Sequence, residues 1–393
     1  MRVYLDHAAT TPCDKSVLSE MLPYFTDDFG NADSQHSFGR ETAKAIADAR
    51  ESVAQCIGCR PNEIYFTGSG SEADNWAIKG TALARQNRGK HIIISAIEHH
   101  AILNSAEWLE KHGFRVTKLP VDSTGIVHPE DLERVIDDET TLVSVMYVNN
   151  EVGTIQPIKQ LADIAHAHGA LFHSDCVQAM PYIHIDVADL GVDLLSMSGH
   201  KFYGPKGVGA LYIRNGVKID KLICGGGQER SQRGGTSNTP AIVGMAAALK
   251  TAVAEMEDNN RHIAALRDHF VDRVLKEIPY VRFNGNVEHR VPSVANFSFE
   301  FVEGEGILML LDFKGIAVSS GSACSSGSLD PSHVLLAMGV PIEISHGSIR
   351  FSFGKDNTME EVDYTVDMLV ETINSLRAMS PLFNTKTGGT YNV

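Results

Sequence analysis

Between residues 63 and 213, short runs of apolar and β-branched residues alternate with segments of helical periodicity. We expect strands at residues 64–67, 91–95, 115–119, 142–148, 170–173, 194–197 and 209–213, and helices at residues 71–85, 99–111, 129–136 and 157–168. This alternation predicts an α/β fold with a mostly parallel, seven-stranded sheet that helices cover on both faces. Ligands of such sheets bind at the carboxyl ends of the strands.

The flanking segments predict a second, smaller unit. Ser37 is expected to cap a long helix that ends near Ile57, after a shorter helix at residues 16–24. Helical periodicity at residues 240–278, strands near 294–298 and 348–353 and a final helix at 358–379 indicate an α+β domain. Because 393 residues exceed one comfortable core, we expect a large domain at 13–256 and a small domain at 257–393 that includes the arm 1–12.

Composition narrows the classes of partner and compartment. The chain has 34 Lys and Arg against 49 Asp and Glu, and its net charge of −15 argues against nucleic acid or an anionic membrane as the main partner. No apolar span is long enough for a signal peptide or a membrane helix, so we expect a cytoplasmic location. Six scattered cysteines do not form a disulfide framework, and neither the Cys56/Cys59 pair nor the His166/His168 pair has the ligand set of a metal site.

Lys201 is the first candidate for chemistry. The apolar run 194–197 breaks at Ser198-Gly199-His200, so Lys201 should emerge from a strand end into a cleft. Such a lysine can form a Schiff base with pyridoxal phosphate (PLP), given an acidic partner for the ring nitrogen and a phosphate cradle. On this segment alone, a solvated loop lysine is an equal alternative. A Walker A loop fails, because Pro205-Lys206 stands where Gly-Lys-Ser/Thr is required.

Two further motifs supply what PLP would need. The glycine turn at residues 68–71 follows a strand and opens a helix, which suits a phosphate. Taken alone, it also matches the Ala-ended dinucleotide fingerprint, with Glu98 beyond the next strand. Asp175 ends the strand before that of Lys201, where its carboxylate could keep a pyridine nitrogen protonated. This neighbour favours PLP.

Three other side chains stand out. His99 follows a strand end, where an imidazole can lie against a cofactor ring, although a polar histidine at a helix start is the alternative. Arg350 stands alone among apolar residues, as either a clamp for a substrate carboxylate or a member of a structural salt bridge. Cys324 lies in a run of serines and glycines that predicts a loop presenting a nucleophilic thiol for sulfur transfer.

Together these motifs resemble the cysteine desulfurases of the NifS/IscS type, PLP enzymes of aminotransferase class V with fold type I. The similarity covers nearly the whole chain, and its most specific parts are Asp175-x-x-Gln178 and residues 198–201, 225–236 and 319–328. Further matches lie at residues 4–11, 30–31, 71–75, 98–99 and 148–154.

The resemblance implies a role for each matching residue. Lys201 would form the Schiff base, with Asp175 at the ring nitrogen, His99 stacked on the ring and Asn150 and Gln178 flanking it. The phosphate would be held by Gly70, Ser71, Ser198 and His200, and by Thr236 of the neighbouring subunit in a homodimer. L-cysteine would bind through Arg350, Asn150 and Asn31, and would give L-alanine and a persulfide on Cys324 for an acceptor such as an iron–sulfur scaffold.

The sequence departs from the family pattern in places. Residues 31–34 read Asn-Ala-Asp-Ser where Asn-Pro-Ser-Ser is usual, Gly70 replaces an alanine, and the tail differs from the segment that docks the cluster scaffold. The acceptor is therefore open between iron–sulfur assembly and thiolation of tRNA or another cofactor, and selenocysteine lyase activity is a further alternative. A non-catalytic protein would need neither Lys201 nor Cys324, an aminotransferase would need no cysteine loop, and an NAD dehydrogenase would need neither Lys201 nor Asp175.

Overall fold

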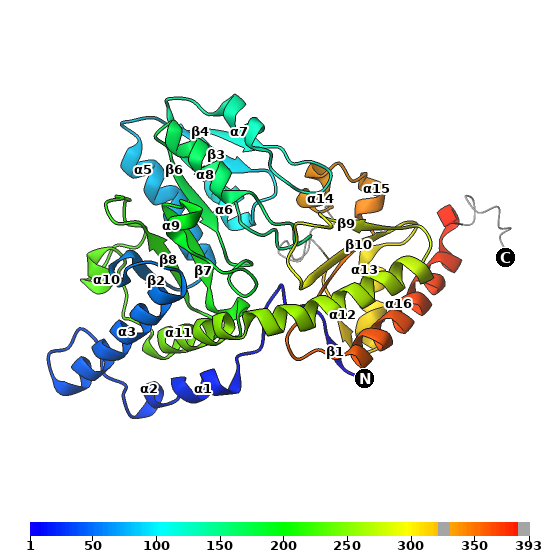
Figure 1. Ribbon diagram of the computed structural model, residues 1–393, viewed down its shortest axis with the longest axis horizontal. Helices are drawn as coiled ribbons and strands as arrows, with labels where there is room; N and C mark the ends of the chain where they lie inside the picture. The colour runs from blue at the N-terminus through cyan, green and yellow to red at the C-terminus, as the bar shows by residue number, and fades with distance from the viewer. Residues whose placement is uncertain (321–330, 384–393) are drawn as a thin grey trace.

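The computed structural model describes residues 1–320 and 331–383, and over these its largest sheet has seven strands in the order β2-β8-β7-β6-β5-β3-β4 (Figure 1). The strands are β2 (Ile64–Thr67), β3 (His91–Ser95), β4 (Arg115–Leu119), β5 (Thr140–Ser144), β6 (Leu171–Asp175), β7 (Leu194–Ser198) and β8 (Gly209–Ile213). From β7 to β4 all neighbours are parallel, whereas β8 runs antiparallel to both β7 and β2. The predicted fold class is confirmed.

Helices cover both faces of this sheet, because each inner strand sends alternate apolar side chains to opposite sides. In β7, Leu195 and Met197 join one core cluster and Leu194 joins another. The first cluster is covered by α1 (Lys15–Met21), α3 (Ser37–Cys56), α7 (Pro129–Val135), α8 (Ile158–Ala167), α9 (Val187–Leu190) and α11 (Thr239–Ala254). The second is covered by α4 (Gly70–Asn75), a π-helical turn (Trp76–Gly80), α5 (Thr81–Arg85) and α6 (His100–Lys111).

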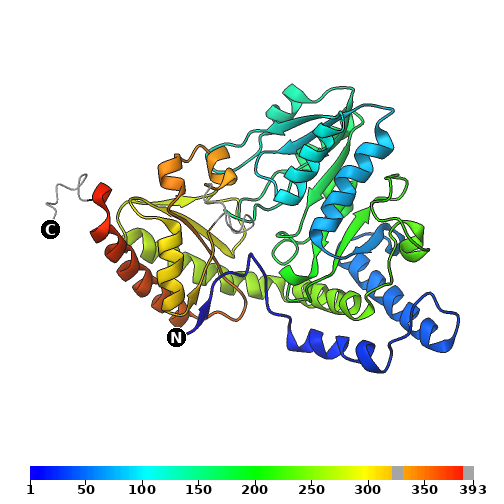
Figure 2. The ribbon, with the colours of Figure 1, turned by 180° about the vertical axis from the view of Figure 1, so that it is seen from behind.

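The C-terminal part forms a separate apolar cluster around an antiparallel sheet in the order β12-β10-β9. Its elements are α12 (Met256–Glu277), β9 (Val281–Asn284), β10 (Val294–Phe299), α13 (Gly304–Phe313), β12 (Ser348–Ser352) and α16 (Met359–Met379). The N-terminal strand β1 (Val3–Tyr4) pairs with β11 (Ile316–Ala317), so the arm packs on this part of the molecule (Figure 2). Two short helices, α14 (His333–Ala337) and α15 (Ile342–Ser345), precede β12 in the chain. Their apolar side chains pack against Ile97 and Met146, which follow strands β3 and β5 of the large sheet.

Some predicted boundaries were wrong. The predicted helix 16–24 is divided into α1 and α2 (Pro23–Thr26), since Pro23 begins a new helix. His36, not Ser37, caps α3, because its Nδ1 accepts a hydrogen bond from Gly39 N at 3.3 Å. The strand predicted at 142–148 ends at Ser144 as β5. None of the described helices is long and apolar enough to cross a membrane.

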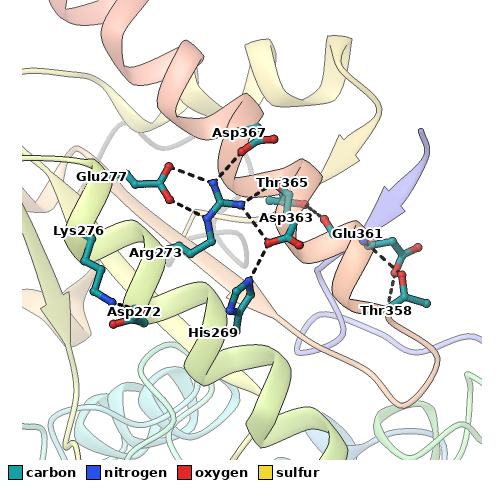
Figure 3. Close-up of polar contacts among 10 residues, drawn as sticks. All are labelled: His269, Asp272, Arg273, Lys276, Glu277, Thr358, Glu361, Asp363, Thr365 and Asp367. Atoms are coloured by element: carbon teal, nitrogen blue, oxygen red, sulfur yellow. Dashed lines mark hydrogen bonds and ion pairs between the residues drawn. The ribbon is translucent and has the colours of Figure 1, made fainter.

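An ion-pair network joins α12 to α16 on the outer side of the small sheet (Figure 3). The Arg273 guanidinium donates to Glu277 on its own helix at 2.7 Å, and to Asp363 and Asp367 on α16 at 3.0 and 2.8 Å. His269 also lies 2.7 Å from Asp363. Because one guanidinium bonds three carboxylates in fixed geometry, this network should stabilise helix docking more than an isolated surface pair would.

We expect Arg273→Met to lower the free energy of unfolding by about 1–2 kcal/mol, less in high salt, because Asp363 and Asp367 both lose the guanidinium that joins them to α12. Thermal unfolding in low and high salt measures this effect. Lys276→Met is the matched control, since Lys276 pairs with Asp272 on its own helix. Equal losses in the two variants would contradict a docking role for Arg273.

Candidate functional site

Lys201 lies in the 3₁₀ turn Gly199–Lys201 that follows β7, at the carboxyl edge of the sheet. Its Nζ donates hydrogen bonds to the carbonyl oxygens of Ala8 at 2.5 Å and Ala9 at 2.9 Å. A cavity of about 280 Å³ opens beside it. The amine therefore faces an enclosed space, held by two carbonyl groups of the N-terminal arm.

The cavity brings together most of the residues that the sequence singled out. Those that line it are Gly70, Ser71, His99, Asn150, Asp175, Gln178, Ser198, His200, Lys201 and Arg350. Two others do not line it: Thr236 is exposed, and Asn31 is exposed with its Oδ1 accepting a hydrogen bond from Asp33 N at 3.0 Å. Cys324 lies outside the described residues.

Asp175 ends β6, directly beside β7 in the sheet. Its Oδ1 accepts a hydrogen bond from Val177 N at 2.9 Å. Burial raises the pKa of the Asp175 carboxyl to about 6, against the opposing effects of the Val177 N–H and the Lys201 charge. A protonated ring nitrogen in the cavity would supply the cationic partner that favours the carboxylate.

His99 is the N-cap of α6, and its Nδ1 accepts a hydrogen bond from Ala101 N at 3.1 Å. In the neutral ring this bond leaves the proton on Nε2. Burial, followed by the charges of Lys201, His100 and His333, lowers the pKa of His99 to about 4. At neutral pH the imidazole is therefore uncharged.

The turn before α4 packs closely on the ends of β6 and β7. A Cβ on Gly70 would lie 2.9 Å from Val177 Cγ2 and 3.1 Å from Ser198 Cβ, so a larger residue would push the turn away. Ser71, Ser198 and His200 line the same end of the site, and His200 Nδ1 lies 3.1 Å from Thr10 Oγ1. Hydroxyl and imidazole groups around a close-packed glycine turn fit a phosphate, and with Asp175 and Lys201 they fit PLP.

Arg350 lies in β12 and is 3% exposed. Its Nη1 donates to Asn150 O at 2.9 Å and its Nη2 to Asp6 Oδ1 at 3.0 Å, while its Nε has no hydrogen-bond partner among the described residues. Arg350 thus forms the salt bridge of one sequence-based alternative, and it also lines the cavity, where a clamp for a substrate carboxylate would have to lie. Asp6 was missed as a partner.

The N-terminal arm is a second feature that the sequence did not indicate. Ala8 O accepts a hydrogen bond from Gln178 Nε2 at 2.8 Å, and Ala8 N donates to Ser352 Oγ at 2.9 Å. Thr11 Oγ1 donates to His200 O at 2.9 Å. The arm therefore connects the cavity wall at β6 and β7 to the strand that carries Arg350.

Two buried carboxyl groups near the cavity were also missed. Asp74, 1% exposed, lines the cavity, and burial followed by the Asp175 charge raises its pKa well above the ordinary value. Glu98 is fully buried; its Oε1 accepts hydrogen bonds from Ser95 Oγ at 2.6 Å and Met146 N at 2.7 Å. Burial raises the pKa of Glu98 to about 8, so this carboxyl group holds a proton near neutral pH. In the sequence, the positions of Asp74 after the glycine turn and of Glu98 after a strand end were the features that could have indicated these two groups.

The order of the sheet and the cavity between neighbouring strand ends place the chain among PLP-dependent enzymes of fold type I. The family model for aminotransferase class-V matches residues 3–365. A cysteine desulfurase IscS from Methanosarcina thermophila is 53% identical over 97% of this chain and 94% of its own length. The cysteine desulfurase of Homo sapiens is 47% identical, over 97% of this chain and 84% of its own length.

Solved structures agree with these relatives. A NifS-like protein has a TM-score of 0.90 and 41% identity, covering 95% of this chain and 100% of that one. The chain therefore belongs to the aminotransferase class-V family and, within it, to the cysteine desulfurases. The predicted family and the predicted PLP dependence are confirmed.

We expect Glu98→Gln to change how stability depends on pH in the cofactor-free protein. The pKa of Glu98 is near 4.5 in the unfolded chain and about 8 in the folded protein. The stabilisation that this difference provides is fully present below about pH 4.5, decreases between about pH 4.5 and 8, and is lost above that window. The loss approaches about 1.4 kcal/mol per pH unit inside that window. Glutamine keeps an oxygen for Ser95 and Met146 but does not titrate.

Thermal unfolding at pH 5.5 and 7.5 tests this expectation. Between these values the parent should lose more stability than Glu98→Gln, so the variant gains relative stability at the higher pH. Glu257→Gln, an exposed position on α12, is the control and should follow the parent. Parallel curves for Glu98→Gln and the parent would show that Glu98 does not take up a proton on folding.

Proposed function

We propose that this chain is a cysteine desulfurase that converts L-cysteine to L-alanine and receives the sulfur on Cys324 as a persulfide. The observation that carries the proposal is the cavity lined by the amine of Lys201, the carboxyl of Asp175 and the guanidinium of Arg350. An amine and a carboxyl group on adjacent strands fit a PLP ring, and a nearby arginine fits the carboxylate of an amino acid.

The roles of the residues follow from their chemistry. Lys201 would hold PLP through Nζ, with Asp175 at the ring nitrogen, Gln178 and Asn150 beside the ring, and Gly70, Ser71, Ser198 and His200 at the phosphate. When bound, PLP supplies an electron sink for the charge left at the substrate Cα. Arg350 would bind the substrate carboxylate, with Asn150 as a further contact.

Proton movement belongs to Lys201 and His99. The Lys201 amine would accept the Cα proton of the bound substrate. The ammonium group formed in this way could donate to Ala8 O and Ala9 O, which already accept hydrogen bonds from Nζ. Uncharged His99 lies on the same wall and presents an Nε2 proton, which can assist without adding a second positive charge.

Sulfur transfer balances without an added oxidant. The Cys324 thiolate attacks the sulfur of the substrate, so an S–S bond forms while the C–S bond breaks and leaves its electron pair on the carbon skeleton. Protonation of that carbon gives L-alanine. The overall change is L-cysteine plus a thiol to L-alanine plus a persulfide.

Variants at Cys324 and Lys201 test the proposal. We expect Cys324→Ala to keep the visible absorbance of lysine-bound PLP but lose about a hundredfold or more in alanine production, because the nucleophile is missing. Lys201→Ala should lose that absorbance band itself. Cys224→Ala, at an exposed cysteine, is the matched control and should keep full turnover. Full turnover in Cys324→Ala would exclude it as the sulfur acceptor.

A homodimer is part of the proposal. Several large apolar side chains between α1 and the start of α3 are exposed, namely Leu18, Leu22, Phe25, Phe29 and Phe38, and the rings of Phe29 and Phe38 lie 5.7 Å apart. Exposed apolar side chains that lie together favour a protein partner. Gln228 Nε2 bonds to Asp33 Oδ2 at 2.6 Å, which links this region to the segment that carries Thr236. As the family resemblance implies, we propose that Thr236 of one copy reaches the phosphate site of the other.

The remaining parts of the proposal concern location, domains and the acceptor. All five cysteines in the described residues are free thiols, which supports a cytoplasmic location. The division into 13–256 and 257–393 with the arm 1–12 is supported by the separate apolar clusters. We place an iron–sulfur scaffold protein as the sulfur acceptor, ahead of tRNA thiolation or selenocysteine use, and passage of radiolabelled sulfur from Cys324 to such a scaffold is its test.

A further inference from the structure

The segment at residues 225–236 covers the open edge of the large sheet. Strand β2 is at one end of the order, so its outer backbone groups have no neighbouring strand among residues 1–320 and 331–383. Arg230 Nη2 donates to Ile64 O at 2.8 Å, and Phe66 N donates to Glu229 Oε2 at 3.0 Å. The segment therefore replaces a strand at this edge and is fixed to the element that leads into the glycine turn of the cavity.

The same segment has an unusual backbone. Glu229, Arg230 and Ser231 have φ angles of 45°, 54° and 63°, three consecutive residues in the left-handed region that favours glycine. Such a conformation persists only where surrounding contacts hold the backbone in place. Arg50 holds Glu229 by donating to both of its carboxylate oxygens, at 2.7 and 2.8 Å. Tyr65 holds Arg230, whose guanidinium lies 4.0 Å from the centre of the Tyr65 ring.

The two ends of the segment are also held together. A Cβ on Gly234 would lie 2.5 Å from Gly225 Cα, so the chain can close here only with glycine. Gly234 N donates to Ile223 O at 3.0 Å. Because the base is closed and the middle is anchored to β2, a displacement at one point of the segment must be shared by the rest.

Arg233 and Glu72 connect this segment directly to the cavity. Arg233 Nε and Nη2 donate to the two carboxylate oxygens of Glu72 at 2.7 and 2.9 Å, and both side chains are at most 20% exposed. Glu72 Oε2 also accepts a hydrogen bond from Gly68 N at 2.8 Å. One carboxylate thus bonds the turn at residues 68–71 and, at the same time, the arginine three positions before Thr236.

We propose that Glu72 and Arg233 are a positioning pair that couples the phosphate-binding turn of one subunit to the Thr236 segment that this subunit presents to its partner. The inference rests on the proposed homodimer with shared phosphate sites. An anion at residues 68–71 fixes Glu72, Glu72 fixes Arg233, and Arg233 fixes the approach of Thr236. Cofactor binding in one site therefore prepares the other site.

Heterodimers with one PLP-competent site test the coupling. Two differently tagged chains are co-expressed, and one carries Lys201→Ala, so the visible band of lysine-bound PLP reports only the other chain's site. In the cis arm Arg233→Met is placed in the chain with intact Lys201; in the trans arm it is placed in the Lys201→Ala chain. We expect PLP to bind about tenfold more weakly in both arms. The cis arm breaks the Arg233–Glu72 pair beside the reporting chain's own turn, and the trans arm breaks the pair in the chain that presents Thr236 to the reporting site.

The control variants distinguish the coupling by Glu72 and Arg233 from the proposed homodimer with shared phosphate sites. Arg261→Met, at an exposed arginine paired with Asp258 on its own helix, should leave PLP binding unchanged in both arms. If Arg233→Met folds poorly, Glu72→Gln takes its place. This variant keeps an oxygen for Gly68 N–H, and it should weaken PLP binding in the same two arms. Thr236→Ala in the Lys201→Ala chain reports whether Thr236 reaches the partner's site at all.

The possible outcomes are distinct. Weakening by Thr236→Ala but not by Arg233→Met in the trans arm would overturn the coupling and leave the shared site intact. A dimer in which Thr236→Ala has no effect, or a monomeric chain in sedimentation, would overturn the shared site and the coupling with it. Weakening by Arg233→Met in both arms supports the positioning pair.

Discussion

Charge at the carboxyl ends of β6 and β7 is the constraint on which the rest of the site depends. An amine at the end of one strand and a carboxyl at the end of its neighbour lose hydration together, so each needs fixed polar partners. For Lys201 these include the carbonyls of Ala8 and Ala9, which come from the far end of the chain. The arm is therefore part of the site's electrostatics as well as its packing, and it ties the two apolar clusters together.

The sequence predicted the adjacency of Asp175 and Lys201 because consecutive strands of a parallel sheet commonly pair, and both residues follow apolar runs that can only be strands. The seven strands and the mostly parallel order followed from the same pattern. Boundaries were less certain where two residues could serve equally: His36 and Ser37 are both able to accept a hydrogen bond from a helix N–H, and the backbone angles decide between them.

What the sequence could not provide are contacts between positions far apart in the chain. Asp6 and Arg350 are separated by 344 positions, and Ala8 and Lys201 by 193, so no periodicity or spacing relates them. The buried state of Asp74 and Glu98 was hidden for a similar reason, since each looks like an ordinary acidic residue at a helix start. Only the packing of α4 and α6 on the sheet removes them from water, which raises the pKa of both carboxyl groups.

The proposed coupling between subunits also depends on contacts between distant positions, here at the edge of the large sheet. An edge strand needs hydrogen-bond partners, and here a segment with three left-handed residues supplies them at a cost in backbone strain. A regular strand could satisfy Ile64 and Phe66 with less strain, but it could not turn back to place Arg233 on Glu72. The strained shape delivers one arginine to the carboxylate beside the glycine turn, and Thr236, three residues further, is exposed, as the proposed homodimer would require.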